Sequence, residues 1–408
     1  MTSYRIKDIA RINSRVLPEG TDEELRFRYI DISAVDGLGN VLIPEEDVAF
    51  ENAPSRARRL APAGSVIVST VRTYLKAIAS APESDDPLVF STGFAVLEAM
   101  AGVDSRYLAY HCRSSLFIDA VVARSVGVSY PAISPSEIGD LPILLPALEE
   151  QRRIAEFLDV ETARIDRLVA KRSEMRGLLA LRRERIIESE LGIDQNARRH
   201  MTPLKYLAEK VTVGIVVTPA KWYVESGGVP ALRGLNVKPG LIGTENLVSI
   251  SSEGNSENVK SRLAAGDVVI VRTGQAGAAA VVPEELDGAN CIDLILVRPG
   301  RKLNPKYLQY VLNSNCVRAQ VAENSVGSIQ AHFNVGSMKQ VSIPSIPLVE
   351  QEEIVAALDE KTGALDMLEQ KLNEQEKLLA DRRQALITAA VTGQLDVTTA
   401  RPAHDRDL

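Results

Sequence analysis

The segment Glu149–Ile187, EEQRRIAEFLDVETARIDRLVAKRSEMRGLLALRRERII, recurs as Val349–Ile387, VEQEEIVAALDEKTGALDMLEQKLNEQEKLLADRRQALI, at a constant offset of 200 positions. The residues shared at this offset include Gln151, Ile154, Leu158, Asp159, Thr162, Asp166, Leu179, Arg182, Arg183 and Ile187. A match of this length without a gap indicates an internal duplication, and a duplication constrains the whole architecture.

The same offset continues upstream at fewer positions. The shared strings there begin at Val71 (Val-Arg-Thr), Tyr107 (Tyr-Leu) and Ser125 (Ser-Val-Gly). We therefore predict two copies of one plan, each a variable globular part followed by a well-kept helix. The predicted boundaries are 1–145 and 200–345 for the globular parts, 146–192 and 346–394 for the helical segments, and 395–408 for a tail.

Within each helical segment, apolar residues recur at alternating spacings of four and three among dense charge. This pattern predicts a coiled coil, because a surface helix of one domain would be shorter and have a wider apolar face. The predicted pairing residues are Ile154, Leu158, Ile165, Leu168, Met175, Leu179, Ile354, Leu358, Leu365, Leu368, Leu372 and Leu379. About 40 helical residues at ~1.5 Å each make a rod of about 60 Å. We expect the two rods to pair antiparallel, with pseudo-twofold symmetry relating the globular parts.

The globular parts are predicted to be α+β domains. The predicted strands are Ser65–Val71, Phe94–Leu97, Asp267–Val271 and Leu294–Val297, and the predicted short helices are Arg106–Cys112 and Pro305–Asn313. The turn residues Asp36–Asn40, followed by the apolar run Val41–Pro44, predict a β-hairpin.

Composition excludes several classes of protein. No apolar run is long enough to span a bilayer, and the first residues lack the apolar stretch of a signal peptide. The three cysteines are far apart and without CxxC spacing, which argues against a disulfide framework or a zinc site and favours the cytoplasm. The net charge of −7 argues mildly against a small basic DNA-binding protein, but a large protein can still present local basic patches.

No motif for catalysis or for metal binding is found. A phosphate-binding loop is absent, and the four histidines have no pairing spacing. The string Asn304-Pro305-Lys306-Tyr307 comes nearest to the NPPY-like motif of an adenine methyltransferase, but Lys306 replaces the second proline. We therefore predict no catalytic residue and no metal ligand.

The duplicated tails resemble those of type I restriction–modification specificity (S) subunits. The resemblance is most specific at Pro146–Leu158, Pro347–Leu358 and Val391–Leu395, and it covers nearly the whole chain. It implies that each globular part is a target recognition domain reading one half of a bipartite site in double-stranded DNA, with the paired helices setting the gap. It also implies two methyltransferase (M) subunits as partners and leaves open whether nuclease-translocase (R) subunits join them. No cofactor is expected on this chain, and S-adenosylmethionine would belong to the M subunits.

Sequence reading requires hydrogen-bonding side chains at base edges and cations at phosphates. The candidate DNA-binding residues of the first domain are Arg56, Arg58, Arg59, Arg72, Thr73, Tyr74, Lys76, Arg124 and Tyr130. Those of the second domain are Lys221, Trp222, Tyr223, Arg233, Asn236, Arg272, Thr273, Gln275, Gln330 and His332. Arg72 and Arg272 are the foremost candidates because they follow equivalent strands. A solvated surface position, or core packing for Trp222, is the alternative at each site.

Two other functions remain open from the sequence. A coiled-coil scaffold that binds proteins would fit the acidic charge, and an enzyme with an unrecognised active site would act as the purified chain alone. Salt-dependent DNA binding distinguishes a DNA-reading subunit from a protein-binding scaffold, because contacts with DNA phosphates release counterions. Since the two globular parts have diverged while the tails have not, we expect two different half-sites and thus an asymmetric target.

Overall fold

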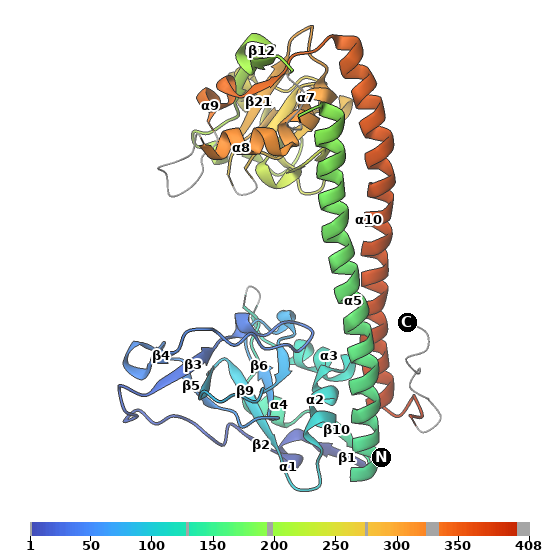
Figure 1. Cartoon of the computed structure of the whole chain (residues 1–408). Helices are drawn as coiled ribbons and strands as arrows, with labels where there is room; N and C mark the ends of the chain where they lie inside the picture. Colours follow the sequence, from blue (N-terminus) through green and yellow to red (C-terminus); the bar gives the residue numbers. More distant parts are fainter. Residues whose placement is uncertain (1, 128–129, 194–198, 274–275, 324–333, 398–408) are drawn as a thin grey trace. The chain divides into compact units, whose positions relative to one another are not determined.

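The structure, a computed structural model, describes residues 2–127, 130–193, 199–273, 276–323 and 334–397 (Figure 1). The chain divides into two compact units, residues 1–173 with 373–408 and residues 174–372. Each unit contains one β-rich domain together with one part of helix α5 (Leu148–Leu191) and one part of helix α10 (Leu348–Val391). The predicted α+β class is confirmed.

The domain of the first unit contains two four-stranded sheets and a terminal strand pair. Its strands are β1 (Thr2–Arg5), β2 (Ala10–Ile12), β3 (Arg26–Ile30), β4 (Val48–Ala49), β5 (Ala57–Leu60), β6 (Val66–Ser69), β7 (Ile78–Ser80), β8 (Leu88–Ser91), β9 (Phe94–Ala99) and β10 (Pro142–Leu145). Its α-helices are α1 (Ile6–Ile9), α2 (Ser105–Arg113), α3 (Ser115–Arg124) and α4 (Pro135–Gly139). The sheet orders are β2-β9-β6-β7 and β4-β3-β8-β5, and β1 pairs with β10.

The domain of the second unit follows the same plan. Its strands are β11 (Met201–Pro203), β12 (Ala208–Val213), β13 (Tyr223–Val224), β14 (Val229–Leu232), β15 (Val237–Lys238), β16 (Leu241–Ile242), β17 (Val248–Ile250), β18 (Val268–Val271), β19 (Ala279–Val281), β20 (Asn290–Cys291), β21 (Leu294–Pro299) and β22 (Ser342–Pro344). Its α-helices are α6 (Ser252–Glu257), α7 (Pro305–Asn313), α8 (Asn315–Glu323) and α9 (Val335–Gln340). The sheet β12-β21-β18-β19 corresponds to β2-β9-β6-β7, and β11 pairs with β22 as β1 pairs with β10.

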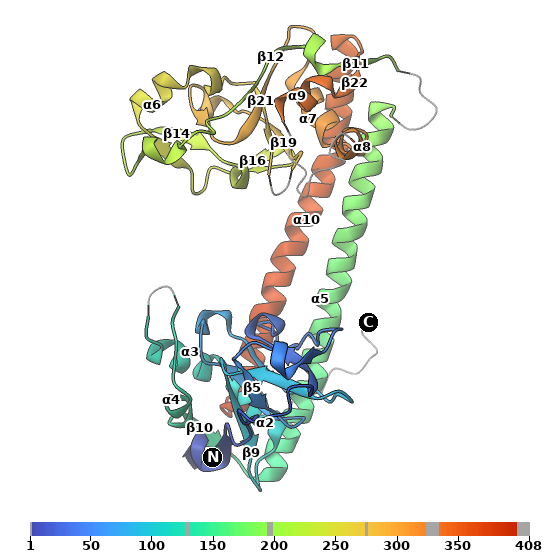
Figure 2. The same ribbon diagram turned by 90° about the vertical axis from the view of Figure 1, so that its left-hand side faces the viewer.

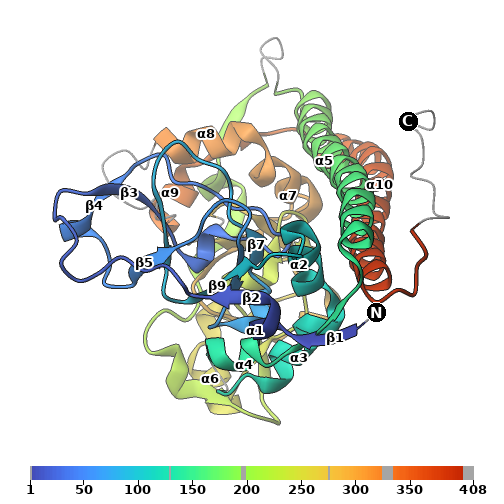
Figure 3. The same ribbon diagram turned by 90° about the horizontal axis from the view of Figure 1, so that it is seen from below.

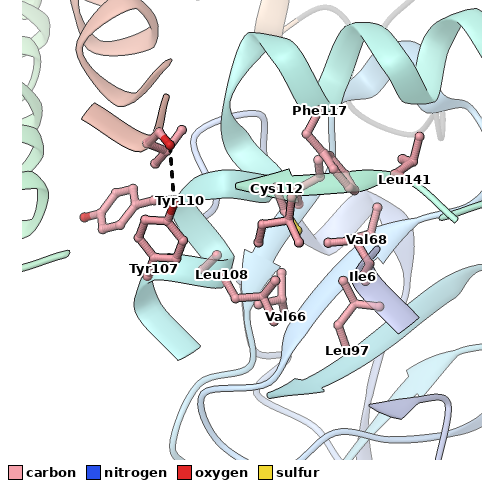
Figure 4. Packing of buried hydrophobic residues seen from close by; sticks show 14 of the residues in the cluster. Ile6, Val66, Val68, Leu97, Tyr107, Leu108, Tyr110, Cys112, Phe117 and Leu141 are labelled. Atoms are coloured by element: carbon pink, nitrogen blue, oxygen red, sulfur yellow. Dashed lines mark hydrogen bonds between the residues drawn. The ribbon is translucent and has the colours of Figure 1, made fainter. Parts of the chain in front are cut away.

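The central strand of each domain is buried on both faces. In β6, Val66 and Val68 face a core shared with α2, whereas Ile67 faces a second core with Phe90 and Phe94. The strand β18 divides two cores in the same way. Figure 4 shows the first of these cores, in which apolar side chains from β6, β9 and α2 meet. Burial on both faces explains why these strands are continuous β-branched runs in the sequence.

Helix α2 lies between its sheet and α5, as Figures 1 and 3 show. Leu108 packs into the core against Val66 and Val68. The Tyr107 hydroxyl donates to the carbonyl oxygen of Leu144 at 2.6 Å and also lies 3.3 Å from the carbonyl oxygen of Val391 at the end of α10, the contact drawn in Figure 4. The predicted short helices are therefore confirmed as α2 and α7, and each begins with a side-chain cap from Asp104 or Asn304.

The hairpin predicted at Asp36–Pro44 is reduced to a single antiparallel bridge between Val35 and Val41, and residues 41–44 form no strand. The carboxylate of Asp36 accepts hydrogen bonds from the backbone of Leu38 and Asn40, both at 2.9 Å, which closes a compact turn. The turn residues predicted the reversal of the chain correctly. A turn alone does not produce paired strands, because strand pairing also requires side chains that pack on one face of the two segments.

Helices α5 and α10 lie side by side and antiparallel, as predicted (Figures 1 and 2). In the first unit Asp166 of α5 pairs with Arg383 of α10 at 3.2 Å. In the second unit the roles are exchanged, because Arg183 of α5 pairs with Asp366 of α10. The recurrent arginines at these two positions therefore join the helices. No helix in the described ranges is long and apolar enough to cross a membrane.

The side chains in the helix seam are distributed unevenly. Leu179, Leu365 and Leu372 form a buried cluster in the second unit. Ile154, Leu158, Ile354 and Leu358 are buried too, but they pack into the cores of the two domains. Ile165 is buried and Leu168 and Leu379 are half-buried, whereas Met175 and Leu368 are 47% and 45% exposed. A strict heptad therefore describes only part of the seam, because the domains cover the ends of the helices.

Candidate nucleic-acid interface

A buried glutamine at the start of each long helix attaches it to its domain. The amide nitrogen of Gln151 donates to the carbonyl oxygens of Gly102 and Pro146, and its amide oxygen accepts from the backbone of Asp104 at 2.9 Å. Gln351 makes the three equivalent bonds in the second unit. The glutamine of the repeated Glu-Gln string is thus explained, because a carboxamide supplies both the donors and the acceptor that these three bonds require.

A tyrosine of the following short helix makes a second attachment. The Tyr110 hydroxyl donates to Asp159 at 2.7 Å, and the Tyr310 hydroxyl donates to Asp359 at 2.8 Å. Burial raises the pKa of each tyrosine to about 12, so each hydroxyl remains a donor at neutral pH. The repeated glutamine and tyrosine therefore hold each domain on its long helix.

In the first domain, candidate residues gather around the end of β6. The Arg72 guanidinium stacks over the Tyr130 ring at 5.4 Å from its centroid. Val71 and Val126 both bridge to Ala132, and these bridges bring the Tyr130 loop beside Arg72. Arg72 has a left-handed backbone, with φ of 51°, and Tyr130 is 67% exposed.

Of the candidate residues that follow Arg72 in the chain, one is buried and two are exposed. Thr73 is buried, and its hydroxyl lies 2.9 Å from that of Ser125, so it ties two loops together. Tyr74 and Lys76 are exposed. Within the described ranges, the Arg72 guanidinium forms no hydrogen bond to a protein acceptor, and its contact is with the Tyr130 ring. This corner of the domain therefore exposes to solvent the guanidinium of Arg72, the ammonium of Lys76 and the rings of Tyr74 and Tyr130.

Of the other basic candidates of the first domain, three belong to or precede a strand of a different sheet and one, Arg124, directly precedes Ser125 of this corner. Arg56, Arg58 and Arg59 belong to or precede β5, in the other sheet. Arg58 stacks over the Phe50 ring at 4.5 Å, and burial lowers the pKa of Arg59. Arg124 is exposed at the end of α3, with its guanidinium 3.5 Å from the Glu137 carbonyl oxygen.

In the second domain, the equivalent post-strand arginine has an acidic partner. Arg272 follows β18 and donates to the Asp293 carboxylate at 2.6 Å. The Thr273 hydroxyl lies 3.5 Å from the same carboxylate. Sequence reasoning missed Asp293 because the search sought donors and cations. The signal that could have found it is its position directly before β21, the strand that pairs with β18.

The remaining candidates of the second domain lie in and around two short strands. The Lys221 ammonium lies 4.0 Å from the centre of the Trp222 ring, and Trp222 packs partly buried against the core that contains Ile250. Tyr223 begins β13 and is exposed. Trp222 thus packs against the core, which was the alternative to a DNA contact, and the Lys221 ammonium covers the face of its ring.

Two further candidates hold a loop together. Asn236 is 2% exposed, accepts from the Arg233 backbone at 3.0 Å and donates to the Glu245 carbonyl oxygen at 3.1 Å. The Arg233 guanidinium donates to the Asn246 carbonyl oxygen at 3.1 Å. Because the Asn236 amide is enclosed, we do not retain it among direct DNA contacts. Gln275, Gln330 and His332 lie outside the described residues.

The described part of the chain contains no group of three or more His, Cys, Asp or Glu side chains that could hold a metal ion. The cysteines Cys112, Cys291 and Cys316 are free thiols. Burial raises the pKa of Cys291 to about 12, which leaves it protonated and unreactive at neutral pH.

Comparison with known proteins gives a consistent result. The family model described as Type I restriction modification DNA specificity domain matches residues 1–174 and 225–377. The Type I restriction enzyme StySPI specificity subunit of Salmonella potsdam is 23% identical over 406 residues, which cover 94% of this chain and 86% of that protein. The Type I restriction enzyme EcoKI specificity subunit of Escherichia coli (strain K12) is 22% identical over 412 residues, again covering 94% and 86%.

A solved structure extends the similarity to the fold. It concerns complex assembly and conformational transition of the type I R-M system, and its matching chain is 25% identical with a TM-score of 0.64. The alignment covers 97% of this chain and 98% of that chain. The similarity therefore extends over both domains and both long helices.

Proposed function

The chain belongs to the family of type I restriction–modification DNA specificity subunits, and from this premise we propose that it selects the DNA sequence on which a modification complex acts. The chain itself performs no chemistry in this proposal. The observation that carries the proposal is that the family match and the internal duplication coincide, so that both β-rich domains stand on the same repeated support.

Each domain reads one half of a bipartite site. The target recognition domains are residues 1–145 and 200–345, and the spacer helices are residues 146–192 and 346–394. Half-sites about one helical turn apart, ~34–36 Å, face the same side of a duplex, so a stiff helix pair selects one register. The half-sites differ in sequence because the reading surfaces differ, with Arg72 beside an aromatic ring in one domain and Arg272 beside a carboxylate in the other.

The DNA contacts divide by chemistry. Arg72 and Arg272 read base edges, since a guanidinium can contact guanine through two parallel hydrogen bonds. Lysine and the remaining arginines bind phosphates, which positions each domain without reading sequence. The phosphate-binding set is Arg56, Arg58, Arg59, Lys76, Arg124, Lys221 and Arg233, and Tyr74, Tyr130, Trp222 and Tyr223 provide aromatic surfaces.

The partners are two methyltransferase subunits that dock along the helices. The duplication keeps Leu178 and Leu378 in both copies although they are 60% and 66% exposed. Exposed leucines at equivalent positions are expected where two copies of one partner bind. S-adenosylmethionine binds to those partners, and a nuclease-translocase subunit adds cleavage where one is present. The complex works in the cytoplasm, where its DNA is.

The test is to express the chain together with its methyltransferase subunits and to map methylated adenines across the host genome. The expected result is one interrupted, asymmetric motif. DNA binding by the assembled complex should also weaken steeply with salt, because phosphate contacts release counterions. Binding to protein alone, with no salt-dependent DNA binding and no motif, would instead support a scaffold and reject the proposal.

A further inference from the structure

One carboxylate in the second domain contacts two neighbouring polar side chains at the end of a buried strand. The Asp293 carboxylate accepts a hydrogen bond from Arg272 at 2.6 Å and lies 3.5 Å from the Thr273 hydroxyl. Val271 of β18 pairs with Leu294 of β21, so the residues just beyond these positions meet at one edge of the sheet. The contact is therefore set by strand pairing and not by a chance approach of two surface loops.

The backbone of Asp293 is unusual for a residue with a side chain. Its φ of 52° lies in the left-handed region, where aspartate is tolerated better than most residues. Its backbone N–H donates to the Ile215 carbonyl oxygen at 3.1 Å, which holds it in place. The equivalent position of the first domain is Gly93, which carries no carboxylate, and Arg72 there lies over Tyr130 instead.

Folding stability is a weak explanation for this ion pair. The side chains of Arg272 and Asp293 are 21% and 43% exposed. Exposed or partly exposed pairs contribute little to stability because water screens the attraction and both side chains lose freedom. By contrast, the same domain contains Arg298 and Asp267 in a bidentate pair whose carboxylate is buried, which is the arrangement expected of a structural pair.

The surroundings of the pair suit the reading of bases. A guanidinium is planar and rigid, so a carboxylate that accepts from one of its nitrogens fixes the orientation of the whole group. Holding the guanidinium plane in advance reduces the freedom lost when it meets a base. The adjoining loop presents the exposed apolar side chains Val216 and Val217, of the kind that contact thymine methyl groups.

We propose that Asp293 is a positioning residue that fixes Arg272 in the orientation with which the second domain reads one base of its half-site. This inference rests on the proposed function of the chain. It assigns the two domains different ways of holding the same arginine, a carboxylate in the second and an aromatic ring in the first.

The test compares full-length variants assembled with the methyltransferase subunits. Asp293→Asn and Asp293→Gly both remove the charge and both tolerate a left-handed backbone, so at least one should fold without strain. Arg272→Ala removes the proposed reader, and Arg72→Ala does so in the first domain. Glu285→Gln changes charge by the same amount in an exposed residue at the other end of β18, and it serves as the control.

The readout is the methylated motif at each base position. Wild type and Glu285→Gln should give the same motif. Asp293→Asn, Asp293→Gly and Arg272→Ala should each lower discrimination about tenfold at one shared position of the second half, leaving the first half intact. Arg72→Ala should alter the first half alone.

Two results would overturn the inference. Unchanged discrimination in both Asp293 variants, with loss in Arg272→Ala, would show that the carboxylate does not position the reader. Unchanged discrimination in Arg272→Ala would show that Arg272 does not read a base. Failure of the wild-type complex to methylate any bipartite motif would instead reject the proposed function, and this inference with it.

Discussion

At the scale of single residues, several of the side chains that the duplication keeps are buried and hydrogen-bonded, such as Gln151 and Tyr110. Positions that differ between the copies occur in the cores as well as on the surface. His111 is one of the buried ones, because it is replaced by Val311 in the second domain.

The buried imidazole of His111 makes the first unit sensitive to acid. Burial lowers its pKa from 6.5 to about 4, while a hydrogen bond from its Nε2 to the Pro142 carbonyl oxygen opposes the shift. Its Nδ1 has no partner within the described residues, so a second proton there would be unsatisfied. The unfolded chain takes up this proton first, because its pKa is the higher one. Above pH ~6.5 the imidazole is neutral in both states and does not affect stability. As pH falls from ~6.5 toward ~4, protonation of the unfolded chain lowers the free energy of unfolding, by about 3 kcal/mol in total.

The measurement is the unfolding free energy of wild type and His111→Gln between pH 7.5 and 4.5. Glutamine can donate to Pro142 but does not titrate, so the variant should lose less stability on acidification. The unit with Val311 provides an internal reference. Parallel curves for the two proteins would contradict the assignment of this pH dependence to His111.

At the scale of elements, each long helix depends on its domain as much as on its partner helix. Ile154 and Leu158 pack into the core of the first domain together with Ile387 and Val391 of the other helix. The start of one helix, the end of the other and the domain thus form one core. An element of this kind is expected to fold with its domain and not as an isolated coiled coil.

Replacing the glutamine at this junction should destabilise it strongly. Gln151→Ala removes three hydrogen bonds and leaves the buried groups of Gly102, Asp104 and Pro146 unpaired, which should cost about 3 kcal/mol. Gln151→Glu should also destabilise, since a carboxylate would face two carbonyl oxygens. The neighbouring exposed Arg152→Ala is the control and should change stability by less than about 0.5 kcal/mol. Denaturant titration checks all three, and equal midpoints would refute the role of Gln151.

At the scale of the whole molecule, two similar units surround their equivalent post-strand arginines differently. The ion pair between Asp166 and Arg383 in one unit is repeated by that between Arg183 and Asp366 in the other. Each helix therefore contributes its first part to one unit and its last part to the other. A duplicated chain of this design can exchange one domain without altering the support of the second.

Domain exchange is the corresponding prediction. Replacing residues 1–145 with the recognition domain of another specificity subunit should change one half of the methylated motif and leave the other half and the gap unchanged. Keeping residues 146–192 preserves Gln151 and the helix pairing, so assembly should survive. Genome-wide methylation mapping is the measurement, with the parental chain as control. A motif changed in both halves would show that the domains do not read independently.

The sequence alone was sufficient for the duplication, the two long antiparallel helices and the central strands of both domains. These features follow from periodicities of residue type, which local chemistry and burial impose directly on the chain. The resemblance to a known family also rests on the helical tails, whose residues are constrained by buried hydrogen bonds.

Only the tertiary structure decided how the candidate side chains are used. It enclosed Asn236 and Thr73, stacked Arg72 over Tyr130 and placed Asp293 against Arg272. No sequence pattern predicts these outcomes, because each depends on strand pairing and loop closure between residues up to dozens of positions apart. A basic residue in a sequence is only a possible DNA contact. Its neighbours in space determine whether its charged group pairs with another group of the protein or remains available to DNA.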